Sequence, residues 1–123
     1  MGLIFFFDTY ALHGIFKSNQ NYKPYISDVQ IVLTRLNLME FYYGIFITKG
    51  KEAADLYYDR LVEFAVDLSD EVIKKAMIFR AQNRNKKLSY VDCIGYIIAK
   101  SLNIKFLTGD KEFKNMENVE FVQ

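Results

Sequence analysis

Two short apolar runs, each leading into an aspartate, constrain the fold of this chain more than any other feature. Residues 3–7 read LIFFF and end at Asp8, while residues 104–107 read IKFL and lead through Thr108 and Gly109 to Asp110. A short apolar run of this kind is typical of a strand buried on both faces in a parallel sheet. Parallel strands need long crossover connections, usually helices. The segments between the two runs are therefore expected to be largely helical.

Helical and strand-like patterns alternate along the rest of the chain. Helical spacing predicts helices at 9–17, 35–48, 51–64, 69–84 and 89–102, and weaker patterns indicate strands at 29–34 and 119–122. Ser69 and Ser89 stand at N-cap positions for the last two helices. Residues 35–48 are apolar almost all round, which predicts a helix buried by its neighbours. The alternation predicts an α/β sandwich around a mostly parallel sheet.

Composition limits the class of protein. A chain of 123 residues, 51% of them apolar, can bury an adequate core as one domain, which we assign to residues 1–123. The net charge of +1 neither indicates nor excludes a nucleic-acid partner. Cys93 is the single cysteine, so no intrachain disulfide can form. Charges interrupt every apolar stretch and no signal-peptide pattern is present, so we expect a soluble, cytoplasmic protein without a membrane partner.

Four acidic residues lie where carboxylates are costly. Asp8 and Asp110 follow the two clear strands, whereas Glu40 and Asp92 interrupt apolar helical segments. Ligands of open α/β sheets bind at the carboxyl ends of the strands. If the two helices pack beside those ends, four carboxylates converge, and they coexist only with divalent cations or with raised pKa values. Oxygen ligands without a nearby histidine suit Mg²⁺ or Mn²⁺ better than Zn²⁺.

Each acid also has a purely structural alternative. Asp8 can cap the helix that begins at residue 9, and Asp110 can cap a short turn. Asp92 lies three residues after Ser89, which is the position of a capping-box acid. Glu40 lies far from both helix ends, and its best structural explanation is an ion pair with Arg35. Four independent coincidences are less probable than a single shared site.

The order of these acids resembles a known family. The motifs FDT at 7–9, LMEF at 38–41, LSYVD at 88–92 and LTGDKEF at 107–113 are similar to the successive acidic motifs of PIN domains. Among PIN domains they most resemble the VapC toxins of prokaryotic toxin–antitoxin pairs. The resemblance spans nearly the whole chain and implies a three-layer sandwich with a mostly parallel central sheet flanked by helices.

The resemblance also implies an activity and a site. By this similarity Asp8, Glu40, Asp92 and Asp110 hold Mg²⁺ or Mn²⁺ for the hydrolysis of RNA phosphodiester bonds, and the hydroxyl of Thr108 supports them. Thr9 and Asn37 match other polar positions of the family, whereas Tyr10 stands where a small residue is common. The implied partners are an RNA substrate, a VapB-like antitoxin and a second copy of the chain in a homodimer.

A basic run supplies candidate contacts to RNA. It consists of Arg80, Arg84, Lys86 and Lys87, with Lys111 and Lys114 placed to line the opposite side. Arg80, Arg84 and Lys87 have the spacing of one helix face if the helix continues that far. The alternative is a solvated surface that keeps the protein soluble. The run leads directly into the segment that bears Asp92, which favours a position close to the chemistry.

Other features are more readily explained by structure than by catalysis. His13 is the single histidine and lies on an apolar helix, and Cys93 is expected in the core. The aromatic residues of the second and third helices are expected to pack in the core or against a partner. Two other functions stay open: a PIN-like module that binds RNA or a partner without cleavage, and an aspartyl-phosphate phosphotransfer domain. The latter needs an acid pair at the first strand, which Asp8-Thr9-Tyr10 lacks.

Overall fold

A four-stranded parallel sheet forms the centre of the computed structural model, which describes residues 3–123. The sheet order is β2-β1-β3-β4, with β1 at Leu3–Phe7, β2 at Val29–Val32, β3 at Lys105–Thr108 and β4 at Val119–Phe121. The longer helices are α1 at Thr9–Phe16, α2 at Arg35–Lys49, α3 at Lys51–Leu61, α4 at Asp70–Gln82 and α5 at Tyr90–Ser101. Short 3-10 turns are η1 at Gln20–Tyr25, η2 at Val62–Phe64 and η3 at Lys111–Phe113. The predicted domain includes residues 1–2, which lie outside the described residues.

Successive residues of β1 point to opposite faces of the sheet, as the strand period requires. Phe5 and Phe7 pack in one core cluster with the side chains of α1, α2 and α3, whereas Phe6 packs in a second cluster with those of α4 and α5. A strand segment with a core on each side must be apolar, which explains Phe5, Phe6 and Phe7. The prediction of burial on both faces fails for Leu3 and Ile4, which are exposed at the start of β1. The predicted α/β sandwich with helices on both faces of a parallel sheet is confirmed.

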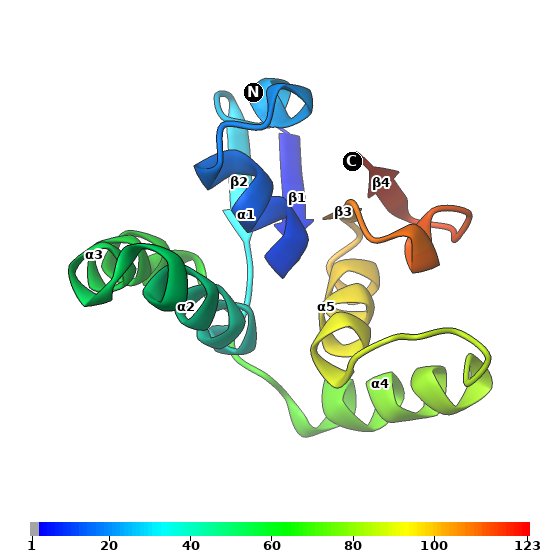
Figure 1. Cartoon of the computed structure of the whole chain (residues 1–123). Helices are drawn as coiled ribbons and strands as arrows, with labels where there is room; N and C mark the ends of the chain where they lie inside the picture. The colour runs from blue at the N-terminus through cyan, green and yellow to red at the C-terminus, as the bar shows by residue number, and fades with distance from the viewer. Residues whose placement is uncertain (1–2) are drawn as a thin grey trace.

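The two central strands bring their carboxyl ends together. Phe7 of β1 pairs with Leu107 of β3, and the backbone nitrogen of Asp8 donates to the carbonyl oxygen of Leu107 over 3.2 Å. In Figure 1, β1 ends close to the beginning of α1, with the α2–α3 pair to one side and α5 to the other. Helices from both cores therefore border the same end of the sheet.

The structure corrects the prediction that residues 35–48 form a helix buried on all sides. Leu38, Phe41 and Ile45 of α2 are buried, but the opposite face carries exposed apolar side chains. Tyr43 is 68% exposed and Ile47 is 63% exposed. The neighbours of α2 are α1 and α3, and together they cover only part of its circumference. The outer apolar face thus lacks a partner within residues 3–123.

The fourth long helix ends earlier than predicted. Its C-cap is Asn83, whose side-chain nitrogen donates to the carbonyl oxygen of Phe79 over 2.8 Å. This bond occupies a carbonyl at the helix end and ends α4 at Gln82. Arg84 therefore lies in the following turn, outside the helix. None of the helices in residues 3–123 is long and apolar enough to cross a membrane.

Candidate active site

Asp8 is fixed at the junction between β1 and α1. It is the N-cap of α1, and its Oδ1 accepts a hydrogen bond of 2.8 Å from the backbone nitrogen of Ala11. Only 2% of the residue is exposed. The structural role predicted as an alternative is thus present. The cap uses one carboxylate oxygen, so the second oxygen takes no part in capping the helix.

Thr108 and Asp110 come from the end of the adjacent strand β3. The backbone nitrogen of Asp110 donates to Oγ1 of Thr108 over 3.0 Å, and Oδ1 of Asp110 accepts from the backbone nitrogen of Glu112. Thr108 is fully buried, and its side chain lies close enough to Asp8 to oppose part of the rise in the pKa of that carboxyl. Thr108 therefore links the carboxylate that ends β1 to the loop that follows β3.

Asp92 reaches the same region from α5. It forms a capping box with Ser89, in which the backbone nitrogen of Asp92 donates to Oγ of Ser89 and the backbone nitrogen of Ser89 donates to Oδ2 of Asp92. One turn later, Gly95 lets the helix lie close to the sheet, because a Cβ there would be 2.6 Å from the ring of Phe6. The cap fixes the start of the helix and the glycine fixes its distance from β1.

Glu40 is held by a hydrogen-bond chain between α1 and α2. The hydroxyl of Thr9 donates to Oε1 of Glu40 over 2.6 Å, and Nδ2 of Asn37 donates to Oγ1 of Thr9 over 3.3 Å. Oδ1 of Asn37 accepts from both the backbone nitrogen and the hydroxyl of Thr34, the N-cap of α2. The predicted alternative, an ion pair with Arg35, is absent from residues 3–123.

The four acids share one electrostatic environment. Burial raises the pKa of Asp8 to about 7, and the charges of Asp92 and Asp110 add to the rise. Burial also raises the pKa of Asp92, again with contributions from Asp110 and from Glu40. The ion pairs within residues 3–123 are Lys51–Asp55, Lys75–Glu71 and Lys100–Glu117, so none of the four acids has a cationic partner there.

The donor set fits a divalent cation, although the acids do not form a ready metal cage. Within the described part of the chain, no three His, Cys, Asp or Glu side chains are grouped closely enough to hold a metal ion. The chemistry of the group nevertheless suits Mg²⁺ or Mn²⁺, since its ligands are oxygens and its negative charge is not balanced by Lys or Arg. A bound cation would offset the repulsion between these acids, which adds to the effect of burial on the pKa of Asp8 and Asp92.

Sequence reasoning did not identify two residues of this arrangement. Thr34 is predicted as the end of a strand but is the N-cap of α2, and Thr34-x-x-Asn37 has the spacing of a capping box with an amide in place of the acid. Glu112 lies within the motif LTGDKEF but has no role predicted from the sequence, and it binds the basic loop to the Asp110 turn. Its Oε1 accepts from the backbone nitrogen of Lys87 over 3.0 Å, and its carbonyl oxygen accepts from Nζ of Lys86 over 3.3 Å.

Of the residues predicted to contact RNA, some form contacts within the protein and others are exposed to solvent. Arg80 donates through Nε to the carbonyl oxygen of Leu88, and its guanidinium lies 4.5 Å from the ring centre of Tyr90. Lys86 is partly buried beside Glu112, whereas Arg84, Lys87, Lys111 and Lys114 are exposed. The helix face predicted for Arg80, Arg84 and Lys87 does not form, because α4 ends at Gln82. RNA binding by these residues stays a prediction.

Cys93 and His13 have the surroundings expected of structural residues. Cys93 is fully buried in the α4–α5 core, and burial raises the pKa of its thiol to about 11. The ring of His13 packs 4.8 Å from the ring of Phe41, and the approach of α1 to α2 at this point requires Gly44. Neither residue belongs to the acid cluster (Asp8, Glu40, Asp92 and Asp110).

The sequence matches the family model described as PIN domain over residues 5–119. No curated protein matches the chain.

Solved structures show the same fold at low sequence identity. VapC20 from Mycobacterium tuberculosis, described as a sarcin–ricin loop cleaving toxin, is 16% identical with a TM-score of 0.77, over 97% of this chain and 99% of that one. A toxin–antitoxin complex from Klebsiella pneumoniae is 18% identical with a TM-score of 0.73, over 94% of each chain. VapBC2 from Rickettsia felis, bound to a promoter DNA fragment, is 18% identical with a TM-score of 0.71, over 98% and 100%. Because the family model covers nearly the whole sequence, this chain belongs to the PIN domain family.

Proposed function

We propose that the chain is a divalent-metal-dependent endoribonuclease that acts as the toxin of a toxin–antitoxin pair. The observation that carries the proposal is the electrostatic coupling of Asp8 and Asp110, which follow β1 and β3, with Asp92 of α5 and Glu40 of α2. These four acids lack a balancing cation within residues 3–123. Membership of the PIN domain family supports a nuclease, and the toxins among its structural neighbours support the biological role.

The acids divide into two roles. Asp8, Asp92 and Asp110 would hold Mg²⁺ or Mn²⁺, which supplies positive charge for the phosphodiester transition state and acidifies a water molecule. Glu40 is suited to orient the attacking water and accept its proton, because Thr9 fixes Oε1. Its Oε2 has no hydrogen-bond partner among the described residues. Thr108 supports Asp8 and the Asp110 turn from the buried side.

Cleavage of RNA by the purified chain tests the activity. We expect cleavage with Mg²⁺ or Mn²⁺, none with EDTA, and none with Asp8→Asn or Asp92→Asn in folded protein. Cleavage in EDTA, or full activity of Asp8→Asn, would contradict the assignment. Metal-independent RNA binding without cleavage would support the alternative of a binding module. A phosphorylated Asp8 would support the phosphotransfer alternative.

The toxin role requires a partner, and we propose a VapB-like antitoxin together with a homodimer. Several structural neighbours are described as toxin–antitoxin or VapBC complexes. The exposed apolar face of α2 offers contact area, since Met39, Tyr43 and Ile47 are each more than half exposed. Tyr43→Glu should weaken binding of the antitoxin encoded beside this gene without changing the unfolding transition. Unchanged binding would remove this face from the proposed interface.

A further inference from the structure

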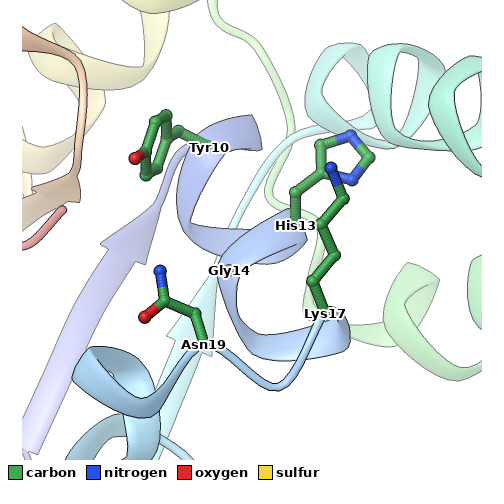
Figure 2. Close-up of a pocket in the computed structure, with 5 residues that line it drawn as sticks. All are labelled: Tyr10, His13, Gly14, Lys17 and Asn19. Atoms are coloured by element: carbon green, nitrogen blue, oxygen red, sulfur yellow. The ribbon is translucent and has the colours of Figure 1, made fainter.

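A cavity of about 300 Å³ lies along the outer face of α1. It is lined by Tyr10, His13, Gly14 and Lys17, with Asn19 from the following turn. The first three belong to α1 and Lys17 is its C-cap; their spacing of i, i+3, i+4 and i+7 places them along one face of the helix. Figure 2 shows Tyr10 at one end of this face and Lys17 at the other, with the Lys17 ammonium beside the His13 ring.

Tyr10 connects this cavity to the candidate active site. It follows Asp8 by two residues, and its ring lies so close to Gly109 that a Cβ at that position would overlap it. Gly109 stands between Thr108, the last residue of β3, and Asp110, one of the four acids. The Tyr10 side chain is still 41% exposed, so part of its ring is open to solvent. A ligand on this ring would lie next to the acids.

The side chains that line this cavity differ in charge from the four acids. Among the described residues that line the cavity there is no carboxylate, and Lys17 is the charged group. Oδ1 of Asn19 accepts from the backbone nitrogen of Asn21 over 3.0 Å, which leaves its Nδ2 as a donor toward the cavity (Figure 2). Burial and the nearby Lys17 lower the pKa of His13, so its ring is neutral at pH 7. The lining thus offers an aromatic face, neutral polar groups and one cation.

We propose that this cavity binds one nucleotide of the RNA strand next to the bond that is cut. The base would stack on Tyr10, and its phosphate would approach Lys17, away from the carboxylates that repel it. A base stacks on an aromatic ring whatever its identity, and a lysine attracts phosphate as a point charge. Asn19 supplies a donor that can distinguish one base edge from another. This inference rests on the proposed ribonuclease function, because it places the cavity on the path of the same substrate.

The absence of tryptophan from the sequence gives a direct binding assay. Tyr10→Trp introduces a single fluorescent indole that retains an aromatic face for stacking. We expect AMP to quench it and to bind about tenfold more tightly than ribose 5-phosphate, which lacks a base. Lys17→Glu in the same chain should weaken AMP binding about tenfold. Calorimetric titration of the unsubstituted protein with AMP checks the result without the substitution.

A lysine outside the cavity provides the matched control. Lys74→Glu reverses an exposed charge on α4 and should leave AMP binding unchanged. Equal affinity for AMP and ribose 5-phosphate, or equal losses from Lys17→Glu and Lys74→Glu, would overturn the proposal. The metal-dependent cleavage assay tests the proposed activity independently of nucleotide binding at the cavity. Cleavage with no nucleotide binding at the cavity rejects this inference alone, whereas binding without any cleavage rejects the proposed activity.

Discussion

The hydroxyl of Thr9 donates a 2.6 Å hydrogen bond to Oε1 of Glu40, and this bond joins the first turn of α1 to the second turn of α2. Thr9 follows Asp8 directly, so a single dipeptide supplies one acid of the cluster and orients another. Nδ2 of Asn37 completes the hydrogen bonding of Thr9. The position of Glu40 therefore depends on the packing of α1 against α2 and not on α2 alone.

Thr9→Val tests this positioning role. Valine has nearly the shape of threonine but cannot donate to Glu40, so the carboxylate should lose its fixed orientation. We expect the kcat of RNA cleavage to fall by about tenfold to a hundredfold, with little change in KM. Thr9→Ser keeps the hydroxyl and should retain most of the activity. Equal rates for the valine and serine variants would show that the hydrogen bond does not serve catalysis.

The sequence predicted the strand ends well because they depend on local pattern. The apolar residues at the end of each strand are buried on both faces, and the acid that follows lies at the carboxyl edge of the sheet, as Asp8 and Asp110 do. The Thr9–Glu40 contact could not be predicted from spacing, since it joins residues 31 apart through the angle between two helices. The exposure of Tyr43 could not be predicted either, because an apolar sequence pattern fits both a helix buried in the core and a helix whose outer face contacts a partner.

Asp8 makes the stability of the metal-free protein depend on pH. The folded chain keeps the Asp8 proton up to a pKa of about 7, whereas the ordinary value is 3.8. Between these values folding takes up a proton, so the free energy of unfolding should fall as the pH rises through this window. The full shift corresponds to at most about 4 kcal/mol. Denaturant unfolding in EDTA, repeated from pH 4.5 to 7.5, measures it.

The control for this pH dependence is Asp8→Asn. Asparagine still caps α1 but does not titrate, so the free energy of unfolding should fall less steeply as the pH rises. Part of this pH dependence of stability should persist, because burial also raises the pKa of Asp92. Identical pH profiles for the two proteins would mean that Asp8 titrates normally in the folded chain.

Gly95 controls how closely the helix that carries Asp92 approaches the sheet. A Cβ at this position would lie 2.6 Å from Cε1 of Phe6 and 3.1 Å from Cε1 of Phe106, and both rings are fully buried. Gly95→Ala should therefore destabilise the fold by about 1 to 3 kcal/mol, even though alanine favours the helix. It should also reduce cleavage, since α5 must move outward with Asp92. Unchanged stability would mean that the two rings can move aside without cost.

The last prediction concerns the basic residues beside the Asp110 turn. Glu112 holds the backbone of Lys87 and the side chain of Lys86 next to this turn, so the loop that carries the exposed residues Arg84 and Lys87 is attached to the segment that follows Asp110. If they contact RNA phosphates, Arg84→Glu with Lys87→Glu should weaken RNA binding and flatten its dependence on salt. Each lost phosphate contact should lower the slope of the log–log plot by about 0.7 for a single strand.

A matched double variant separates a local contact from a change in net charge. Lys74→Glu with Lys105→Glu reverses the charges of two exposed residues, one on α4 and one at the start of β3. Both double variants have the same net charge, so a nonspecific effect would flatten the salt dependence equally in the two proteins. A lower slope for the Arg84 and Lys87 variant alone would place the RNA backbone beside Glu112. Equal slopes for that variant and the unsubstituted protein would place the RNA path elsewhere on the surface.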